Sequence, residues 1–416
     1  MNILLVSNSD IEGGAARAGY RLHQGLQEIN AHSRLLVQTK RSGDQKVLSI
    51  RSSTGIGQAT SALRLTLDRL PLRLYPNRSQ TTYSPQWLPD KIASQIAHLN
   101  PDIVNLHWVN GGYLQAESIA QLSKPIVWTL HDMWGFTGGC HYDEGCARYA
   151  QSCGACPQLG SHQNRDLSRW VWRRKAKAWK NVDLTIVAPS QWLANSAKAS
   201  SLFKDRRVEW IPYGIDTKIY RPIDRRTARE ILGLPQEKRL ILSGSLGAIS
   251  DKRKGFHLLQ PALQELRQTQ WHDQLELVVF GTSRPENPPD LGLKTHYVGT
   301  LNDDLSLALL YSAADVFVAP SVQDNLPNTV MESLACGTPA IAFNIGGMPD
   351  MIEHGRNGYL ATPYSISELA QGIIWILEDS ERYQNLAQRA REKVEQEFPL
   401  ALQAERYSSL FQGLLP

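Results

Sequence analysis

The chain has 416 residues, of which 42% are hydrophobic and 20% are charged, and this composition excludes a disordered or collagen-like protein. Its 44 basic and 40 acidic residues give a formal net charge of +4, which is too balanced to indicate nucleic-acid binding. One hydrophobic core rarely serves so long a chain, so we expect two domains. Met1 leads into a short apolar run without a basic leader or cleavage site, and no uninterrupted apolar run reaches about 18 residues. We therefore expect a cytoplasmic protein without a membrane span.

The first half of the chain alternates short apolar runs, rich in β-branched residues, with helical patterns such as residues 15–29. Each run is typical of a buried parallel strand, and the alternation of strand and helix is that of a doubly wound sheet. The expected strands are residues 2–7, 33–39, 102–108, 125–132 and 183–190.

Polar and glycine residues follow several of these strands, at the sheet edge where open α/β proteins bind ligands. Gly13 and Gly14 would let the backbone approach a ligand, although an ordinary glycine turn explains them equally. Their spacing is not the G-x-G-x-x-G of a dinucleotide site, which argues against a Rossmann dehydrogenase. His107 and His131 end two expected strands, and Asp132 is placed to orient His131. Each histidine is either a site residue or a polar neighbour satisfied by the protein.

Four of the five cysteines lie within 17 residues, at Cys140, Cys146, Cys153 and Cys156. The last two have the spacing of a zinc knuckle, and four thiolates would complete a tetrahedral structural zinc site. Reduced thiols without a metal and a redox role are the alternatives.

A basic segment, residues 165–180, holds seven lysines or arginines and one acid, interleaved with Trp170, Trp172 and Trp179. A basic amphipathic helix of this kind can lie on an anionic membrane surface. The alternative is a solvated helix face whose tryptophans pack inward.

The second half repeats the strand and helix alternation and predicts a second sheet of the same class. Its helical patterns include residues 256–269 and 303–313. The expected strands are residues 239–245, 274–281, 295–299, 315–321 and 339–344. Residues 208–222 combine two prolines and a glycine and read as a hinge, so we place the domains at 1–212 and 213–416.

Two loops of the second half carry charges suited to a phosphate and a sugar. Lys252, Arg253 and Lys254 follow the first strand and can neutralise a leaving phosphate, unless they form only a solvated turn.

In the second loop, a helix is expected to begin near Asn328 or Thr329, and its N-terminus suits a phosphate. Asp324 before it and Glu332 within it can accept hydrogen bonds from a sugar and a ribose. Thr329 and Glu332 also fit a capping box, which requires no ligand.

The segment from Pro320 to Ala361 resembles the donor-site signature of family 4 retaining glycosyltransferases of the GT-B type, particularly bacterial surface-polysaccharide enzymes of the colanic-acid type. The likeness covers nearly the whole chain. It implies an α/β fold of two facing Rossmann-like domains with a cleft between them. The first domain would bind the acceptor and the second the nucleotide sugar, and the last helix is a candidate to pack back on the first domain.

The resemblance also implies roles for single residues. Asp324 and Glu332 match the two acids, separated by seven residues, that contact the donor sugar and the ribose in that family. Most members have Glu and Gly where this chain has Asp324 and Asn325. Lys254 matches a lysine on the donor diphosphate, whereas Ser245 replaces an expected arginine that Arg253 or Lys252 would substitute.

The resulting assignment names His131, Asp324 and Lys254 as catalytic, His131 because it matches a cleft histidine near the donor sugar. The implied donor-binding residues are Gly14, Arg253, Lys254, Gly281, Leu301, Asn325, Leu326, Asn328, Thr329, Val330 and Glu332. The implied acceptor-side residues are Gly13, His107 and Trp108.

By this resemblance the chain is expected to be a retaining hexosyltransferase of polysaccharide biosynthesis. It would move a sugar from a nucleoside diphosphate sugar to a hydroxyl of a saccharide or lipid-linked saccharide. We expect no catalytic metal, no nucleic acid, a structural zinc ion at the cysteines, and peripheral contact with the inner face of a membrane. The alternatives are a catalytically silent nucleotide-sugar-binding scaffold and a sugar-nucleotide epimerase on the same fold.

Overall fold

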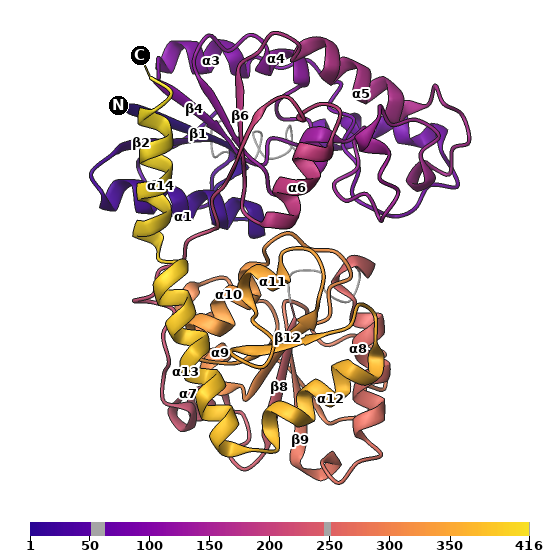
Figure 1. Cartoon of the computed structure of the whole chain (residues 1–416), viewed down its shortest axis with the longest axis vertical. Coiled ribbons are helices and arrows are strands. Elements are labelled where there is room, and N and C mark those ends of the chain that lie inside the picture. Colours follow the sequence, from indigo (N-terminus) through magenta and orange to yellow (C-terminus); the bar gives the residue numbers. More distant parts are fainter. Residues whose placement is uncertain (51–62, 245–250, 416) are drawn as a thin grey trace. The chain divides into compact units, whose positions relative to one another are not determined.

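The computed structural model describes residues 1–50, 63–244 and 251–415 (Figure 1). The chain divides into two compact units, each built on one sheet. Unit 1 comprises Met1–Gly214 with Ala401–Pro416, and unit 2 comprises Ile215–Leu400. None of the helices in the described ranges is long and apolar enough to cross a membrane.

The sheet of unit 1 has seven parallel strands in the order β3-β2-β1-β4-β5-β6-β7. They are β1 (Asn2–Ser9), β2 (His32–Thr39), β3 (Val47–Ser49), β4 (Ile103–Leu106), β5 (Ile126–Thr129), β6 (Leu184–Ala188) and β7 (Arg207–Trp210). The strand order reverses between β1 and β4, and ligands of doubly wound sheets bind at the carboxyl ends of the strands at such a point. The loops that carry Gly13 and His107 begin there.

Helices cover both faces of this sheet. They are α1 (Gly14–Glu28), α3 (Ile92–Leu99), α4 (Ala116–Ile119), α5 (Leu167–Ala178), α6 (Gln191–Ala199) and α14 (Leu400–Gln412). One apolar cluster joins α1 and α14 to alternate residues of β1 and β2, and another joins α3, α4 and α6 to the opposite face. Tyr407 and Phe411 fix α14 here, because both are fully buried and each contributes about 1.5–3 kcal/mol by burial.

The sheet of unit 2 has six parallel strands in the order β10-β9-β8-β11-β12-β13. They are β8 (Arg239–Gly244), β9 (Leu275–Phe280), β10 (Thr295–Tyr297), β11 (Val316–Ala319), β12 (Ala340–Phe343) and β13 (Gly358–Ala361). The helices are α7 (Arg225–Leu232), α8 (Phe256–Leu266), α9 (Asp304–Ala313), α10 (Asn328–Ala335), α11 (Met348–Met351), α12 (Ile366–Leu377) and α13 (Ser380–Glu397). Short 3-10 helices occur in both units. They span Leu70–Leu74, Trp134–Phe136, Arg148–Ala150 and Pro157–Leu159 in unit 1, and Lys252–Lys254 and His272–Gln274 in unit 2.

The prediction of two doubly wound α/β sheets is confirmed, and all ten expected strands are present. The sequence pattern missed β3, β7 and β13, which have only three or four residues each. In unit 2 the strand order reverses between β8 and β11, so the loops that hold Lys254 and Asp324 leave the sheet side by side.

Candidate active site

Asp324, in the loop between β11 and α10, is the buried centre of an ion cluster whose two cations are partly exposed. Lys254 donates a hydrogen bond from Nζ to its Oδ2 at 2.7 Å, and Nη1 of Arg253 lies 3.4 Å from its Oδ1. The Ser321 hydroxyl donates to the same Oδ2 at 3.3 Å. Burial opposes ionisation of Asp324, but Lys254 and Arg253 outweigh it and lower its pKa to about 2. The carboxylate is therefore charged at neutral pH and held by two cations.

Two glycines bring the loops around Asp324 into backbone contact. A Cβ atom on Gly255 would lie 1.7 Å from the carbonyl oxygen of Pro320, and one on Gly346 would lie 2.0 Å from the carbonyl oxygen of Asp324. The backbone N–H of Val322 donates to the carbonyl of Arg253 at 2.8 Å. Only glycine permits this approach, which holds the Lys254 and Asp324 loops in a fixed register.

Helix α10 begins at Asn328, as predicted, and its N-cap residue is Pro327. Thr329 therefore lies inside the helix, and the capping-box interpretation of Thr329 and Glu332 is wrong. Glu332 is 3% exposed and accepts a hydrogen bond from the Tyr311 hydroxyl at 3.0 Å. A buried, hydrogen-bonded carboxylate in the first turns of the helix is placed to receive a hydroxyl group.

The backbone amide of Val330, expected to face a phosphate, donates instead to the carbonyl of Pro327 at 3.1 Å. Asn325 and Leu326 are buried in the loop before α10, and Asn325 donates from its N–H to Oδ1 of Asp324 at 3.1 Å. Gly281 follows β9, with its N–H bonded to the carbonyl of Gly299 at 2.8 Å, and Leu301 is half-buried after β10. The position of Ser245 lies outside the described residues.

In unit 1, the predicted glycines stand where β1 turns into α1. Gly13 is the N-cap residue of α1, with a φ of 93° that favours glycine, and Gly14 is the first residue of the helix. Gly19, one turn further along the helix, packs on the ring of His107, since a Cβ atom there would lie 3.1 Å from Nδ1. The glycine loop and His107 are thus neighbours at the carboxyl edge of the sheet.

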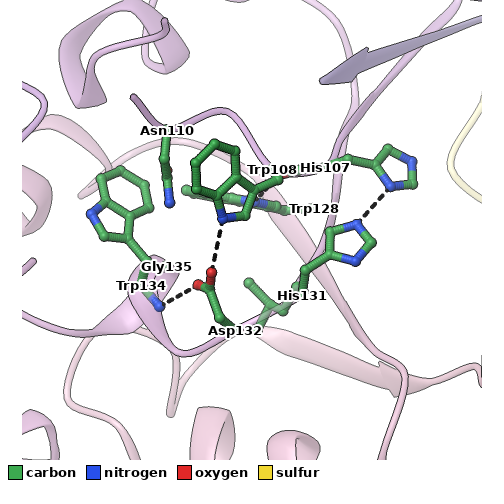
Figure 2. Close-up of a pocket in the computed structure, with 9 residues that line it drawn as sticks. His107, Trp108, Asn110, Trp128, His131, Asp132, Trp134 and Gly135 are labelled. Carbon is green, nitrogen blue, oxygen red and sulfur yellow. Dashed lines mark hydrogen bonds between the residues drawn. The ribbon is translucent and has the colours of Figure 1, made fainter. Parts of the chain in front are cut away.

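A chain of buried hydrogen bonds runs through both predicted histidines (Figure 2). His131 Nε2 lies 2.9 Å from His107 Nδ1, and His107 Nε2 lies 2.9 Å from Oδ1 of Asn105. The other nitrogen of His131, Nδ1, is 2.6 Å from the hydroxyl of Tyr213. Burial lowers the pKa of His131 to about 4, and burial together with the neighbouring His131 lowers the pKa of His107 well below its ordinary value, so both rings are neutral at pH 7.

The proton positions along this chain follow from Asn105, whose amide nitrogen donates to the carbonyl of Val127 and to the Thr129 hydroxyl. Its Oδ1 therefore accepts from His107 Nε2–H, which leaves His107 Nδ1 to accept from His131 Nε2–H. Nδ1 of the neutral His131 then accepts from Tyr213. Both ring nitrogens of His131 are engaged by protein groups in this structure.

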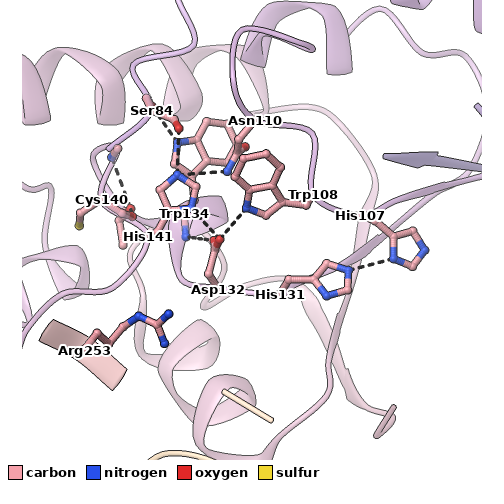
Figure 3. A network of polar contacts seen from close by, with 12 residues as sticks. Ser84, His107, Trp108, Asn110, His131, Asp132, Trp134, Cys140, His141 and Arg253 are labelled. Carbon is pink, nitrogen blue, oxygen red and sulfur yellow. Dashed lines mark hydrogen bonds and ion pairs between the residues drawn. The ribbon is translucent and has the colours of Figure 1, made fainter. Parts of the chain in front are cut away.

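Asp132 holds a second polar network at the end of β5 (Figure 3). Its carboxylate accepts hydrogen bonds from Trp108 Nε1 at 3.0 Å, from the backbone N–H of Trp134 at 2.9 Å and from His141 Nδ1 at 2.6 Å. Burial opposes ionisation of Asp132, but His141 and these donors lower its pKa overall. Nε2 of His141 lies 2.9 Å from the Ser84 hydroxyl. Asp132 thus orients His141 rather than His131.

The sequence pattern did not identify His141, Asn105 or Tyr213, because no motif or regular spacing links them to the histidine or aspartate that each contacts. The sequence offered one indication for His141, because this histidine directly follows Cys140 in the cysteine-rich segment singled out above. A small pocket lies beside this network, lined by His107, Trp108, Asn110, Trp128, Leu130, His131, Asp132, Trp134 and Gly135.

The structure does not support the predicted zinc site. Within the described part of the chain, no group of three or more histidine, cysteine, aspartate or glutamate side chains is arranged to hold a metal ion. Cys140 and Cys156 are buried in an apolar cluster with Tyr83. Burial raises the pKa of the Cys153 thiol to about 12 and that of Cys156 to about 11. Thiols in such surroundings are protonated and inert at neutral pH.

The basic segment forms α5, which combines features of both interpretations. Lys175 and Trp179 point inward, and Lys175 Nζ donates to the carbonyls of Trp134 and Thr137. Trp170 is 45% exposed on the outer face, with the guanidinium of Arg174 stacked on its ring.

Comparison with known proteins matches both halves of the chain to sugar transferases. The family model described as Glycosyltransferase Family 4 matches residues 12–219, and that described as Glycosyl transferases group 1 matches residues 224–393. A sulfoquinovosyl transferase of Arabidopsis thaliana is 26% identical over 316 residues, which are 74% of this chain and 56% of that protein. The chain spans about half the length of several curated relatives that it matches.

Solved structures show the same architecture. Sucrose-phosphate synthase from Thermosynechococcus elongatus has a TM-score of 0.71 at 20% identity, covering 100% of this chain and 99% of that one. Anabaena HepE in complex with UDP-glucose has a TM-score of 0.66 at 17% identity, covering 100% of both chains. At such low identity these likenesses establish the fold alone.

Two parallel-sheet units that match these family models define a glycosyltransferase of the GT-B class. The family 4 model alone covers half of the residues. The chain belongs to glycosyltransferase family 4.

Proposed function

We propose that this glycosyltransferase moves a sugar, with retention of configuration, from a nucleoside diphosphate sugar to a hydroxyl group of a saccharide or lipid-linked saccharide in polysaccharide synthesis. The observation that carries the proposal is the cluster of the partly exposed Lys254 and Arg253 on the buried Asp324, shortly before the N-terminus of α10. Cations and a helix N-terminus stabilise a departing diphosphate, and a fixed carboxylate receives a sugar hydroxyl.

Lys254, Asp324 and Glu332 each have a role in the proposed reaction. The Lys254 ammonium has three N–H donors and gives one to Asp324, so two remain for phosphate oxygens or water. Asp324 would accept from a donor-sugar hydroxyl, and Glu332 from the ribose. As the bond between the sugar and the phosphate breaks, negative charge grows on the leaving diphosphate and Lys254 stabilises it. The acceptor hydroxyl then bonds to the anomeric carbon and gives its proton to an oxygen of the departing diphosphate.

In unit 1, we infer that His131 is a positioning residue. Its ring nitrogens bond to His107 and Tyr213, so it acts by fixing the end of β5 and the adjacent Asp132. The glycine loop at Gly13 and Gly14, with Trp108, would line the substrate side of the same sheet edge.

A ligand screen tests the donor class. Thermal melting of the full chain with UDP, GDP, ADP and their sugars should reveal one base, since ligand at about 100 times its dissociation constant stabilises by about 2.7 kcal/mol. Glu332→Gln should weaken binding of that nucleotide about 10-fold, because the ribose hydroxyl then donates to a neutral amide oxygen and not to a carboxylate.

The matched control is Glu286→Gln, an exposed glutamate in unit 2, which should bind like the wild type. Transfer assays with the selected donor then separate the alternatives. Nucleotide binding without turnover in any assay favours a scaffold, and an isomerised donor without acceptor favours an epimerase. Absence of stabilisation by every nucleotide would contradict the proposal.

We also propose that the outer face of α5 contacts an anionic membrane. Exposed Trp170 on α5, Trp87 and Leu74 would insert, being 45%, 36% and 80% exposed. The Tyr75 hydroxyl accepts from the N–H of Leu167, and Arg174 donates to the carbonyl of Gln86, so these three side chains belong to adjoining segments. The exposed basic residues around them are Arg69, Arg73, Arg78, Arg165, Arg173 and Lys177. Such a surface fits an interfacial site.

Vesicle co-sedimentation checks this surface. Binding should increase with the fraction of anionic lipid, and Trp170→Ser should reduce it several-fold. Trp210→Ser is the control, because Trp210 is as exposed as Trp170 but lies on β7, at the edge of the unit 1 sheet. Binding that does not depend on anionic lipid, or an equal loss in both variants, would exclude α5 as the membrane surface.

A further inference from the structure

The pocket at the carboxyl ends of β4 and β5 has room for a single small group. Its volume is about 10 Å³, the space of one water molecule or one hydroxyl group. The side chains of Trp108, Trp128 and Trp134 form its apolar walls (Figure 2). A whole sugar ring does not fit inside, but a hydroxyl projecting from a ring resting against the mouth does.

Asn110 gives this pocket an unsatisfied hydrogen-bond acceptor. The side chain is 2% exposed, and its Nδ2 donates toward Nε2 of His141 at 3.4 Å (Figure 3). Its Oδ1 is buried and has no hydrogen-bond partner among the described residues. Buried amide oxygens are almost always paired, so an unpaired one that lines a pocket indicates a site for a donor group.

The surrounding network keeps Asn110 from turning to another partner. Its backbone carbonyl accepts from Asn8 Nδ2 at 2.7 Å, and the backbone N–H of Asn8 donates to the carbonyl of Trp108. His141 is held by hydrogen bonds to Asp132 and Ser84, and these bonds fix the position of its Nε2, the atom that Asn110 Nδ2 contacts. The acceptor is therefore preorganised before a ligand arrives.

The lining selects the class of ligand. It contains no lysine or arginine among the described residues, and it contains the charged carboxylate of Asp132, so it disfavours a phosphate or a carboxylate. Indole walls suit the apolar face of a neutral sugar. A neutral hydroxyl donates to Asn110 Oδ1 without bringing a charge into the pocket.

We propose that Asn110 is a specificity-determining residue that accepts a hydrogen bond from one saccharide hydroxyl, with Asp132 and His141 holding it in place. This inference rests on the proposed sugar transfer but concerns a subsite of unit 1 that transfer chemistry does not require. The hydroxyl belongs to the acceptor saccharide or to the donor sugar, and both have the same chemistry at Asn110.

Direct binding tests the subsite independently of turnover. Saturation-transfer NMR on the full chain would measure binding of methyl glycosides, UDP and UDP-glucose. Asn110→Leu keeps the branched shape of the side chain and removes its acceptor together with its Nδ2 donor, and it should weaken the bound saccharide about 10- to 100-fold. Asn164→Leu, at an exposed asparagine of unit 1, should bind like the wild type. Melting curves for both variants report whether the fold is intact.

The two sources of the hydroxyl give different results. Weaker methyl glycoside binding with unchanged UDP-glucose binding assigns the acceptor, whereas weaker UDP-glucose binding with unchanged UDP binding assigns the donor sugar. Monodeoxy analogues identify the hydroxyl, because the analogue lacking it should bind wild type and Asn110→Leu equally.

Equal binding of every saccharide by a folded Asn110→Leu variant would overturn the proposal. So would an ordered water that remains on Asn110 Oδ1 in a crystal structure with saccharide bound. If folding of Asn110→Leu fails, Asn110→Ser supplies the same comparison. If saccharide binding depends on Asn110 but no sugar is transferred, the subsite stands and the proposed function fails. The failure of the subsite and the failure of the proposed function can therefore be told apart.

Discussion

Replacing Lys254 by methionine is expected to lower kcat/KM for sugar transfer about a thousandfold. The methionine side chain has nearly the same length and no charge, so the substitution removes the ammonium without opening a cavity. A preorganised donor aimed at charge that develops in the transition state is worth about 10²- to 10³-fold in rate, and a cation on a diphosphate lies at the upper end. Because the charge grows mainly in the transition state, the loss should fall more on kcat than on KM.

The matched control for this prediction is Lys252→Met. The sequence offered Lys252 as one substitute for the missing arginine, but Lys252 is exposed in the same short 3-10 helix. Lys254 Nζ lies 2.7 Å and Arg253 Nη1 lies 3.4 Å from Asp324, so we assign that role to Arg253. The control should keep nearly wild-type kcat/KM and melting temperature. Lys254→Met should also be less stable, since Asp324 then keeps only Arg253 at 3.4 Å as a cation. An equal loss of kcat/KM in both variants would show that the loop's total charge matters and not this ammonium.

The sheets could be predicted from sequence because buried parallel strands are short uninterrupted apolar runs, which are easy to recognise. Strand β13 contains Gly358 and is only partly buried, and β7 is exposed at the sheet edge, so neither has that signal. The position of α14 could not be derived from its own sequence. Its apolar residues require a sheet face, but only the tertiary structure shows that β1 and β2 supply it.

The contact between Lys254 and Asp324 was easier to predict than the network around Asp132, for a physical reason. Lys254 and Asp324 lie in two loops whose strands, β8 and β11, are neighbours, so strand order brings them together, and Glu332 lies in the helix that follows the Asp324 loop. His141 reaches Asp132 from a long irregular segment, and Asn110 from the loop after β4. No periodicity encodes these contacts.

Two sequence patterns were ambiguous because one set of residues fits two structures. Thr329 and Glu332 have capping-box spacing, but Pro327 occupies the N-cap position and places Thr329 within the helix. The cysteine spacing suits a zinc knuckle, yet Cys140 and Cys156 pack as small apolar residues. Local spacing does not determine burial, and burial decides between these interpretations.

Acid is expected to destabilise unit 1 through its buried histidines. His131 titrates near 6.5 when unfolded, whereas burial lowers its pKa to about 4 in the folded chain. Between these values the unfolded state binds more protons, so the free energy of unfolding falls as the pH falls. The slope is about 1.4 kcal/mol per pH unit for one histidine, and the loss amounts to about 3 kcal/mol by pH 4.

His131→Asn should remove this share of the acid sensitivity. The asparagine amide can still donate toward His107 and accept from Tyr213, but it does not bind a proton in this range. Hydrogen exchange of β5, measured from pH 7 to 4 in the full chain, reports the local free energy of opening. The wild-type value should fall more steeply than that of the variant, by about 1.4 kcal/mol per pH unit. His162→Asn, at an exposed histidine of unit 1, is the control, and its slope should follow the wild type. Parallel slopes for wild type and His131→Asn would mean that His131 already carries a proton in the folded chain. Tyr213 would then have to accept from His131 Nδ1–H, which reverses the His131–Tyr213 bond and leaves the bonds from Asn105 to His131 in the order deduced above.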